Sequence, residues 1–96
     1  MDISQAEIDA FCQRHGVQRL SLYGSVLRDD FRPESDVDVL VEFLPGRTPG
    51  MIGFGQMILE LREIFRREVD LRTPHDLSSY FRDEVLRSAR PLHDAA

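Results

Sequence analysis

Residues 24–43 read GSVLRDDFRPESDVDVLVEF, and this stretch decides the fold. Gly24 and Ser25 close one apolar run, and after ten intervening residues Asp36 and Asp38 stand at the head of the next. Successive side chains of a strand point to opposite faces, so the two carboxylates share a face about 6 to 7 Å apart, opposite the apolar residues that alternate with them. The stretch therefore predicts two strands, with a glycine–serine bend after the first and a pair of acids opening the second.

A third acid, Asp70, stands between Val69 and Leu71 in a short apolar run. If that run forms a strand beside the strand of Asp38, its carboxylate lies within about 5 Å of that side chain. Three ionised carboxylates about 6 Å apart repel by roughly 2 to 3 kcal/mol per pair at an effective dielectric of 20, a cost that a bound cation relieves. Mg²⁺ is the natural occupant, because it takes hard oxygen ligands and shares positions with phosphates, and two such ions can serve one displacement. We therefore expect Asp36, Asp38 and Asp70 to bind metal.

The glycine–serine bend at residues 24–25 has the features of a phosphate-binding site. A glycine at the end of a strand lets the backbone approach an anion closely, and Ser25 with the following amides can donate to phosphate oxygens. All twelve positive charges of the chain are arginine, so any cationic phosphate contact is a guanidinium. Arg28, one turn further on, can reach the same phosphates. We therefore expect Gly24, Ser25 and Arg28 to bind the phosphates of a nucleotide.

The apolar periodicity predicts the remaining elements. Ser4 with Glu7 is a capping-box signature at the start of a helix, and Gly16 supplies its stop. The elements expected are a helix over about 4–15, strands over 17–23 and 37–43, the longest helix over about 54–67, a strand over about 68–72, one or two helical pieces over about 76–88, and a short extended end near residues 91–92. This order predicts an α+β fold, with a small mixed β-sheet and helices packed mainly on one face.

Composition limits the classes of function. The chain has 96 residues, which predicts one domain over residues 1–96 without a second lobe to enclose a large substrate. Its net charge of −5 disfavours non-specific nucleic-acid binding, which needs a basic surface. A single cysteine, Cys12, fits a reducing compartment, and no apolar run has signal-peptide or membrane-spanning length. We expect a cytoplasmic protein with no membrane association.

The motif from residue 24 to 38, together with the later acid, resembles the signature of the nucleotidyltransferase superfamily, which includes the β-type DNA polymerases and aminoglycoside nucleotidyltransferases. At this length the chain is most similar to the minimal nucleotidyltransferase family. The resemblance implies the nucleotidyltransferase fold. It also implies that Gly24 and Ser25 hold the triphosphate and that Asp36 and Asp38 bind the metals. Asp70 would then be the third carboxylate, which binds metal and assists deprotonation of the acceptor hydroxyl.

The same resemblance implies a biological role. Members of the minimal family are frequently the antitoxins of bacterial pairs whose toxin is an all-helical HEPN ribonuclease, and such antitoxins transfer AMP from ATP to a tyrosine of the toxin. We therefore expect a Mg²⁺-dependent protein adenylyltransferase with ATP as substrate and a HEPN toxin as partner. Two alternatives stay open, namely a catalytically inactive antitoxin that blocks its partner sterically and a nucleotidyltransferase that acts on a small molecule or RNA.

Two other constellations are weaker. Cys12 and His15 are three residues apart on one helix, as half of a zinc site would be, but the other histidines offer no matching pair, so packing is favoured for Cys12. Arg87 and His93 have the spacing of a HEPN nuclease motif, but Pro91 interrupts the helix that such a motif needs.

Overall fold

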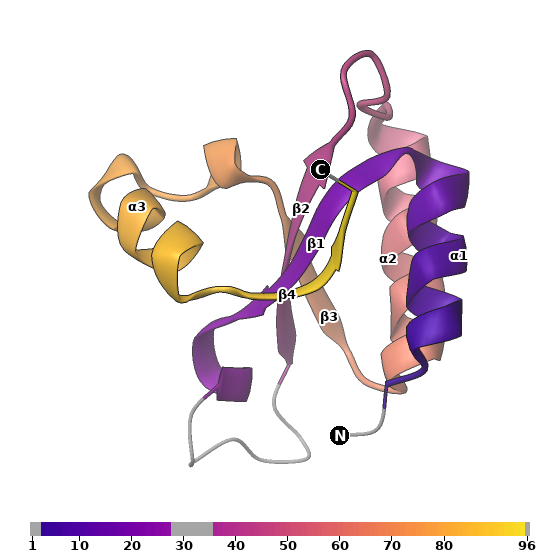
Figure 1. Ribbon diagram of the computed structural model, residues 1–96, viewed down its shortest axis with the longest axis horizontal. Coiled ribbons are helices and arrows are strands. Elements are labelled where there is room, and N and C mark those ends of the chain that lie inside the picture. The colour runs from indigo at the N-terminus through magenta and orange to yellow at the C-terminus, as the bar shows by residue number, and fades with distance from the viewer. Residues whose placement is uncertain (1–2, 28–35, 96) are drawn as a thin grey trace.

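The computed structural model describes residues 3–27 and 36–95, shown in Figure 1. The elements in chain order are α1 (Gln5–His15), β1 (Val17–Tyr23), the 3₁₀ turn η1 (Gly24–Leu27), β2 (Val37–Phe43), α2 (Met51–Phe65), β3 (Val69–Arg72), the 3₁₀ turn η2 (Pro74–Asp76), α3 (Ser79–Ser88) and β4 (Arg90–Asp94).

The four strands form one mixed sheet in the order β3-β2-β1-β4. Strand β1 is antiparallel to both β2 and β4, whereas β2 and β3 run parallel. Parallel neighbours need a long crossover connection, and α2 supplies it. The predicted α+β fold with a mixed sheet is therefore confirmed, including the expected pairing of the strand over 69–72 beside the strand over 37–43.

The two faces of the sheet are covered differently. Helices α1 and α2 lie together on one face, at the right in Figure 1, and α3 lies on the other face. The main core, between the sheet and α1 and α2, contains Ile8, Phe11, Cys12, Val17, Leu20, Leu22, Val37, Val39, Val41, Met57, Leu61, Phe65 and Leu71. A smaller cluster under α3 joins Tyr23, Leu40 and Leu77. The helices therefore pack mainly on one face, as predicted, while α3 partly covers the opposite one.

Local signals explain where α1 begins and ends. The Glu7 amide donates to the Ser4 hydroxyl at 3.3 Å, which satisfies one of the free amides of the first turn. At the other end Gly16 takes the left-handed conformation with φ 66°, a common way for a helix to stop. The helix predicted over about 4–15 is confirmed.

Helix α2 differs slightly from its prediction over about 54–67. It begins at Met51, because the Phe54 amide donates to the Gly50 carbonyl and closes a first turn whose Met51 and Ile52 side chains are exposed. It ends at Phe65, because Arg66 has a left-handed φ of 57°. Apolar spacing detects only the buried face of a helix, so an exposed first turn carries no such signal.

None of the described helices is both long and apolar enough to cross a membrane.

Candidate active site

Two of the predicted acids lie side by side in the sheet. Asp38 of β2 is the register partner of Asp70 of β3, so their Cα atoms belong to adjacent parallel strands about 4.8 Å apart. Their neighbours Val39 and Leu71 are buried in the main core, which places both carboxylates on the opposite face. The prediction that the strand of Asp70 lies beside the strand of Asp38 is confirmed by the pairing of the two backbones.

Gly24 lies directly against Asp38. It follows Tyr23, the residue that pairs with Asp38 across β1 and β2. A Cβ atom at position 24 would collide with Oδ2 of Asp38, and the glycine has a φ of +74°, which side-chain-bearing residues rarely adopt. The Asp38 carboxylate can therefore lie this close to position 24 only because glycine has no side chain.

A groove of about 630 Å³ opens above these residues. One wall is the end of β1, the start of η1 and Asp38, and the other wall is α3. The lining residues are Tyr23, Gly24, Leu27, Asp38, Phe81, Glu84, Val85 and Ser88. This volume falls within the range of small-molecule sites in proteins.

Sequence reasoning missed the α3 wall of this groove. Its residues Phe81, Glu84, Val85 and Ser88 follow the i, i+3, i+4, i+7 spacing of one helical face, so the signal was present. The spacing identified a face, but nothing local connected that face to Asp38.

The carboxylate of Asp70 has a partner that the sequence analysis did not single out. Arg72 lies two residues further along β3, and its Nε and one Nη each donate to a different oxygen of Asp70, both at 3.2 Å. Both side chains are partly exposed, at 47% for Arg72 and 38% for Asp70. The bond and charge of Asp70 raise the pKa of Arg72, so the guanidinium carries its charge throughout the working range of pH.

Negatively charged side chains surround Tyr23 in the β-sheet wall of the groove. Burial raises the pKa of Tyr23 to about 12, and the nearby charges of Asp38 and Asp70 raise it in the same direction, while Arg72 opposes them. Burial is the largest cause of this rise, and the smaller contributions of Asp38 and Asp70 show that their negative charges act at Tyr23.

The other predicted site residues are less completely placed. Asp36 directly precedes β2 and is exposed, and the adjacent Val37 amide donates to the Glu68 carbonyl at 2.9 Å. Ser25 belongs to η1, but its side chain is outside the description, and Arg28 lies outside the described residues altogether.

The three acids do not all meet in the side-chain arrangement observed. Across residues 3–27 and 36–95 no three Asp, Glu, His or Cys side chains gather closely enough to hold a metal ion. The register brings Asp38 and Asp70 together, but Asp70 is bonded to Arg72. The three carboxylates nevertheless fit Mg²⁺, since they provide only hard oxygen ligands. The metal roles of Asp36, Asp38 and Asp70 stay predictions.

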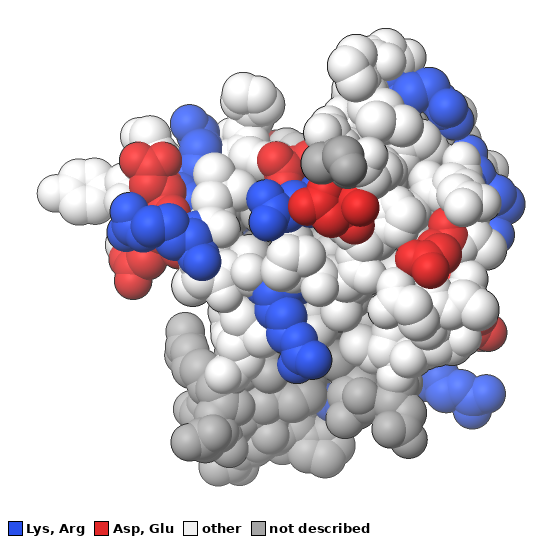
Figure 2. All heavy atoms as spheres, in the orientation of Figure 1, with Lys and Arg blue, Asp and Glu red and all other residues white. Residues whose placement is uncertain are grey.

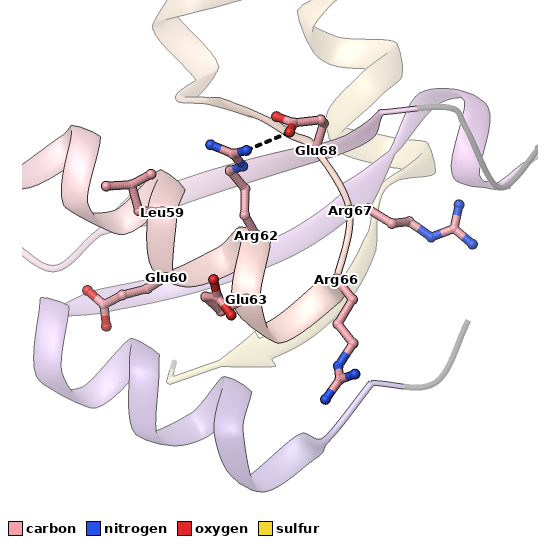
Figure 3. Close-up of a pocket in the computed structure, with 7 residues that line it drawn as sticks. All are labelled: Leu59, Glu60, Arg62, Glu63, Arg66, Arg67 and Glu68. Atoms are coloured by element: carbon pink, nitrogen blue, oxygen red, sulfur yellow. Dashed lines mark hydrogen bonds and ion pairs between the residues drawn. The ribbon is translucent and has the colours of Figure 1, made fainter.

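A second groove lies on the outer side of the C-terminal end of α2 (Figure 3). It also measures about 630 Å³ and contains an Arg62–Glu68 ion pair at 2.6 Å. No predicted site residue lines it. Figure 2, in the orientation of Figure 1, shows acidic and basic side chains interspersed over the described part of this side of the molecule, rather than one continuous basic surface.

The two weaker constellations have structural explanations. Cys12 is fully buried in the main core, and this burial raises the pKa of its thiol to about 12, so the packing interpretation is confirmed. His15 bonds to Glu60 of α2 at 2.7 Å. His93 bonds to Asp9 of α1 at 2.9 Å, which ties β4 to the first helix.

The fold is that of a nucleotidyltransferase domain. A family model described as "Nucleotidyltransferase domain" matches residues 7–92, and the chain belongs to this family. It is 34% identical over 76 residues to a Methanocaldococcus jannaschii protein named as a candidate protein adenylyltransferase, covering 79% of this chain and 80% of the relative. It is 32% identical over 75 residues to the protein adenylyltransferase MntA of Thermococcus cleftensis, covering 78% and 74% of the two chains.

Solved structures agree on the fold. A structure described as a candidate minimal nucleotidyltransferase superposes with a TM-score of 0.74 at 34% identity, covering 91% of this chain and 87% of the other. A toxin–antitoxin complex with AMP-PNP gives 0.74 at 19% identity, covering 96% and 74%. A complex of a tri-AMPylated Shewanella oneidensis HEPN toxin with its MNT antitoxin gives 0.64 at 20% identity, covering 94% and 69%. The last two likenesses establish shared architecture alone.

Proposed function

We propose that this protein is an antitoxin that transfers AMP from ATP to a hydroxyl group, that of a tyrosine, on a HEPN ribonuclease toxin and thereby neutralises it. The observation that carries the proposal is the placement of Asp38 beside Asp70 and against Gly24 at the floor of an open groove. Relatives named as protein adenylyltransferases, at 32% and 34% identity, support the choice of reaction.

Each residue of the arrangement has a role in this reaction. Gly24 and the amides of η1 hold the triphosphate, with Ser25 and Arg28 as further donors. Asp36, Asp38 and Asp70 would hold Mg²⁺, which when bound lowers the cost of negative charge on the phosphates. Asp70 accepts the proton of the acceptor hydroxyl.

The transfer conserves atoms and charge in a simple way. The acceptor oxygen forms a bond to the α-phosphorus of ATP, and the bond from that phosphorus to the bridging oxygen of the β-phosphate breaks. Pyrophosphate leaves, and the hydroxyl proton passes to Asp70. The product is a phosphodiester between AMP and the tyrosine side chain.

The partner supplies what this chain lacks. The groove is open to solvent, and its α3 wall carries Phe81, which is 59% exposed. An acceptor presented by a folded protein can close such a groove. Among the structural neighbours, the MNT antitoxin whose HEPN toxin is tri-AMPylated is an example of this kind of pair. We place the reaction in the cytoplasm, where ATP is available and a lone thiol such as Cys12 stays reduced.

The test uses the protein, Mg²⁺, labelled ATP and a HEPN toxin as the partner. We expect the mass of the partner to increase by AMP with the wild-type protein and not with Asp38→Asn, which keeps the size of the side chain against Gly24. Asp83→Asn, an exposed acid on α3 that does not line the groove, is the matched control and should label the partner normally.

Two other outcomes would replace the proposal. Equal suppression of the toxin by the wild-type protein and Asp38→Asn, without label on the partner, would identify an antitoxin that acts by steric binding. Label on RNA or on a small molecule, with none on the partner, would identify a nucleotidyltransferase with a different acceptor.

A further inference from the structure

Arg72 is bonded to Asp70, one of the predicted metal ligands. It is the register partner of Leu40, so it lies two register pairs beyond Asp38 and Asp70 on the same two strands. Side chains two residues apart on a strand share a face, and the guanidinium of Arg72 reaches back along β3 to Asp70. It thus lies on the groove side of the sheet, within the electrostatic range of Asp38 and Tyr23.

The bond to Asp70 engages both oxygens of that carboxylate. Each of the two oxygens accepts one N–H from the planar fork of the guanidinium, an arrangement that lysine could not reproduce. A divalent cation that binds Asp70 takes at least one of the same oxygens, at a distance of about 2.1 Å for Mg²⁺. Arg72 and the cation would then share that oxygen, which weakens the contact of each with Asp70, and their positive charges repel each other.

We propose that Arg72 is a positioning residue that competes with the divalent cation for Asp70 and thereby lowers the affinity of the site for the metal. This inference rests on the proposed function, because it assumes that Asp70 is a metal ligand. In this role Arg72 compensates the charge of Asp70 beside Asp38 and gives up at least one of its hydrogen bonds when the metal binds. An ordinary surface ion pair would have no effect on metal binding.

The first test measures binding of Mn²⁺ alone, by water-proton relaxation, to the full chain without nucleotide. Arg72→Met keeps an unbranched side chain of similar length but removes the charge and the fork. Because an exposed ion pair is of modest strength, we expect this variant to bind Mn²⁺ about two- to fivefold more tightly than the wild-type protein. Unchanged or weaker binding would overturn the inference.

Matched variants separate this effect from others. Arg66→Met removes the same charge from the outer groove of α2 and should leave the affinity unchanged, so equal tightening there would assign the effect to net charge and overturn the inference. Asp38→Asn and Asp70→Asn should each weaken Mn²⁺ binding. If neither does, the carboxylate site of the proposed function itself fails. If both do while Arg72→Met behaves as wild type, only the role of Arg72 is wrong.

The second test observes the guanidinium directly. The Nε–H resonance of Arg72 is identified in ¹⁵N spectra as the signal missing from Arg72→Met. Saturating Mg²⁺ should shift this signal in the wild-type protein, because the bond to Asp70 is lost, and should not shift it in Asp70→Asn. A signal that stays in place in the wild-type protein would contradict the proposed competition.

Discussion

At the scale of single residues, the site depends on the contact between Gly24 and Asp38. The glycine has a left-handed backbone, and the space that a side chain would fill is taken by a carboxylate oxygen. Two requirements therefore coincide at one position, the backbone conformation and the close approach. Either alone favours glycine, and together they tie the bend after β1 to the acid on β2.

Gly24→Ala should abolish most of the transferase activity. The added Cβ must displace the Asp38 carboxylate, and a misplacement of about 1 Å at a reacting centre can cost about 100-fold in rate. Gly46→Ala is the matched control, because Gly46 has a similar φ of +75° but nothing within 4 Å of the added atom. Both variants should lose about 1 kcal/mol of stability, and only the first should lose activity in the AMP-labelling assay. Equal activity of the two variants would show that the contact is unimportant.

Asp76 should make stability depend on pH. Its carboxylate accepts from the amide and the hydroxyl of Thr73, at 3.0 and 3.1 Å, and these bonds lower the pKa of Asp76. A pKa that is lower in the folded state gives stability above the unfolded value of about 3.9, which is lost as the pH falls through the folded value. The group is solvent-exposed, so we expect Asp76→Asn to cost only about 0.5 kcal/mol at pH 7. Urea unfolding should show this difference between the two proteins at pH 7 and a smaller difference at pH 3, and a difference that is undiminished at pH 3 would exclude this cause.

At the scale of elements, α2 determines how the site is assembled. It connects the parallel strands β2 and β3, and its buried residues Met57, Leu61 and Phe65 press against the face opposite to the acids. The register that pairs Asp38 with Asp70 is therefore held by packing on the far side of the sheet, since a slip of one residue would exchange the buried and exposed faces of β3.

A pair of leucines on α2 tests this packing. Leu61 is fully buried in the main core, whereas Leu59 is 58% exposed on the same helix. Leu61→Ala should cost about 2 to 5 kcal/mol, because it leaves a cavity in addition to the lost burial, and Leu59→Ala should cost less than about 0.5 kcal/mol. Chemical denaturation of both variants measures the difference. Similar losses would mean that the outer face of α2 is packed as tightly as the inner one.

At the scale of the whole molecule, the two faces of the sheet have different roles. One is covered by α1 and α2 and contains most of the core, while the other carries the acids beneath the groove along α3. The main core and the predicted site residues thus lie on opposite faces of the same sheet. The acids are kept out of the apolar interior, where unpaired charges would be very costly.

Cys12 reports on the integrity of the whole core. It is fully buried and the pKa of its thiol is raised to about 12, so at pH 8 it is both inaccessible and uncharged. We expect a thiol reagent to modify it only through opening of the core, at rates that increase with denaturant in parallel with global unfolding. Rapid labelling of the native protein, at the rate of an unfolded control, would contradict the packing of α1 described above.

Much of the fold was predictable because its signals are local. The strands over 17–23 and 37–43 were expected at the bounds observed, since alternation of apolar side chains marks a strand with one buried face. The cap at Ser4 and the stop at Gly16 are likewise readable within a few residues. The site residues were proposed from their chemical types and their spacing, and their roles stay predictions.

The sequence by itself determined where the strands and most of the helices lie, and it supplied the hypothesis that Gly24 and the three acids belong to one kind of chemistry. Only the tertiary structure decided that Asp38 and Asp70 are register partners, that α3 forms the second wall of the groove, and that Arg72 takes both oxygens of Asp70. The physical reason is that burial of a face leaves a periodic trace along the chain. Which faces meet depends on packing between distant segments, and those contacts leave no local pattern.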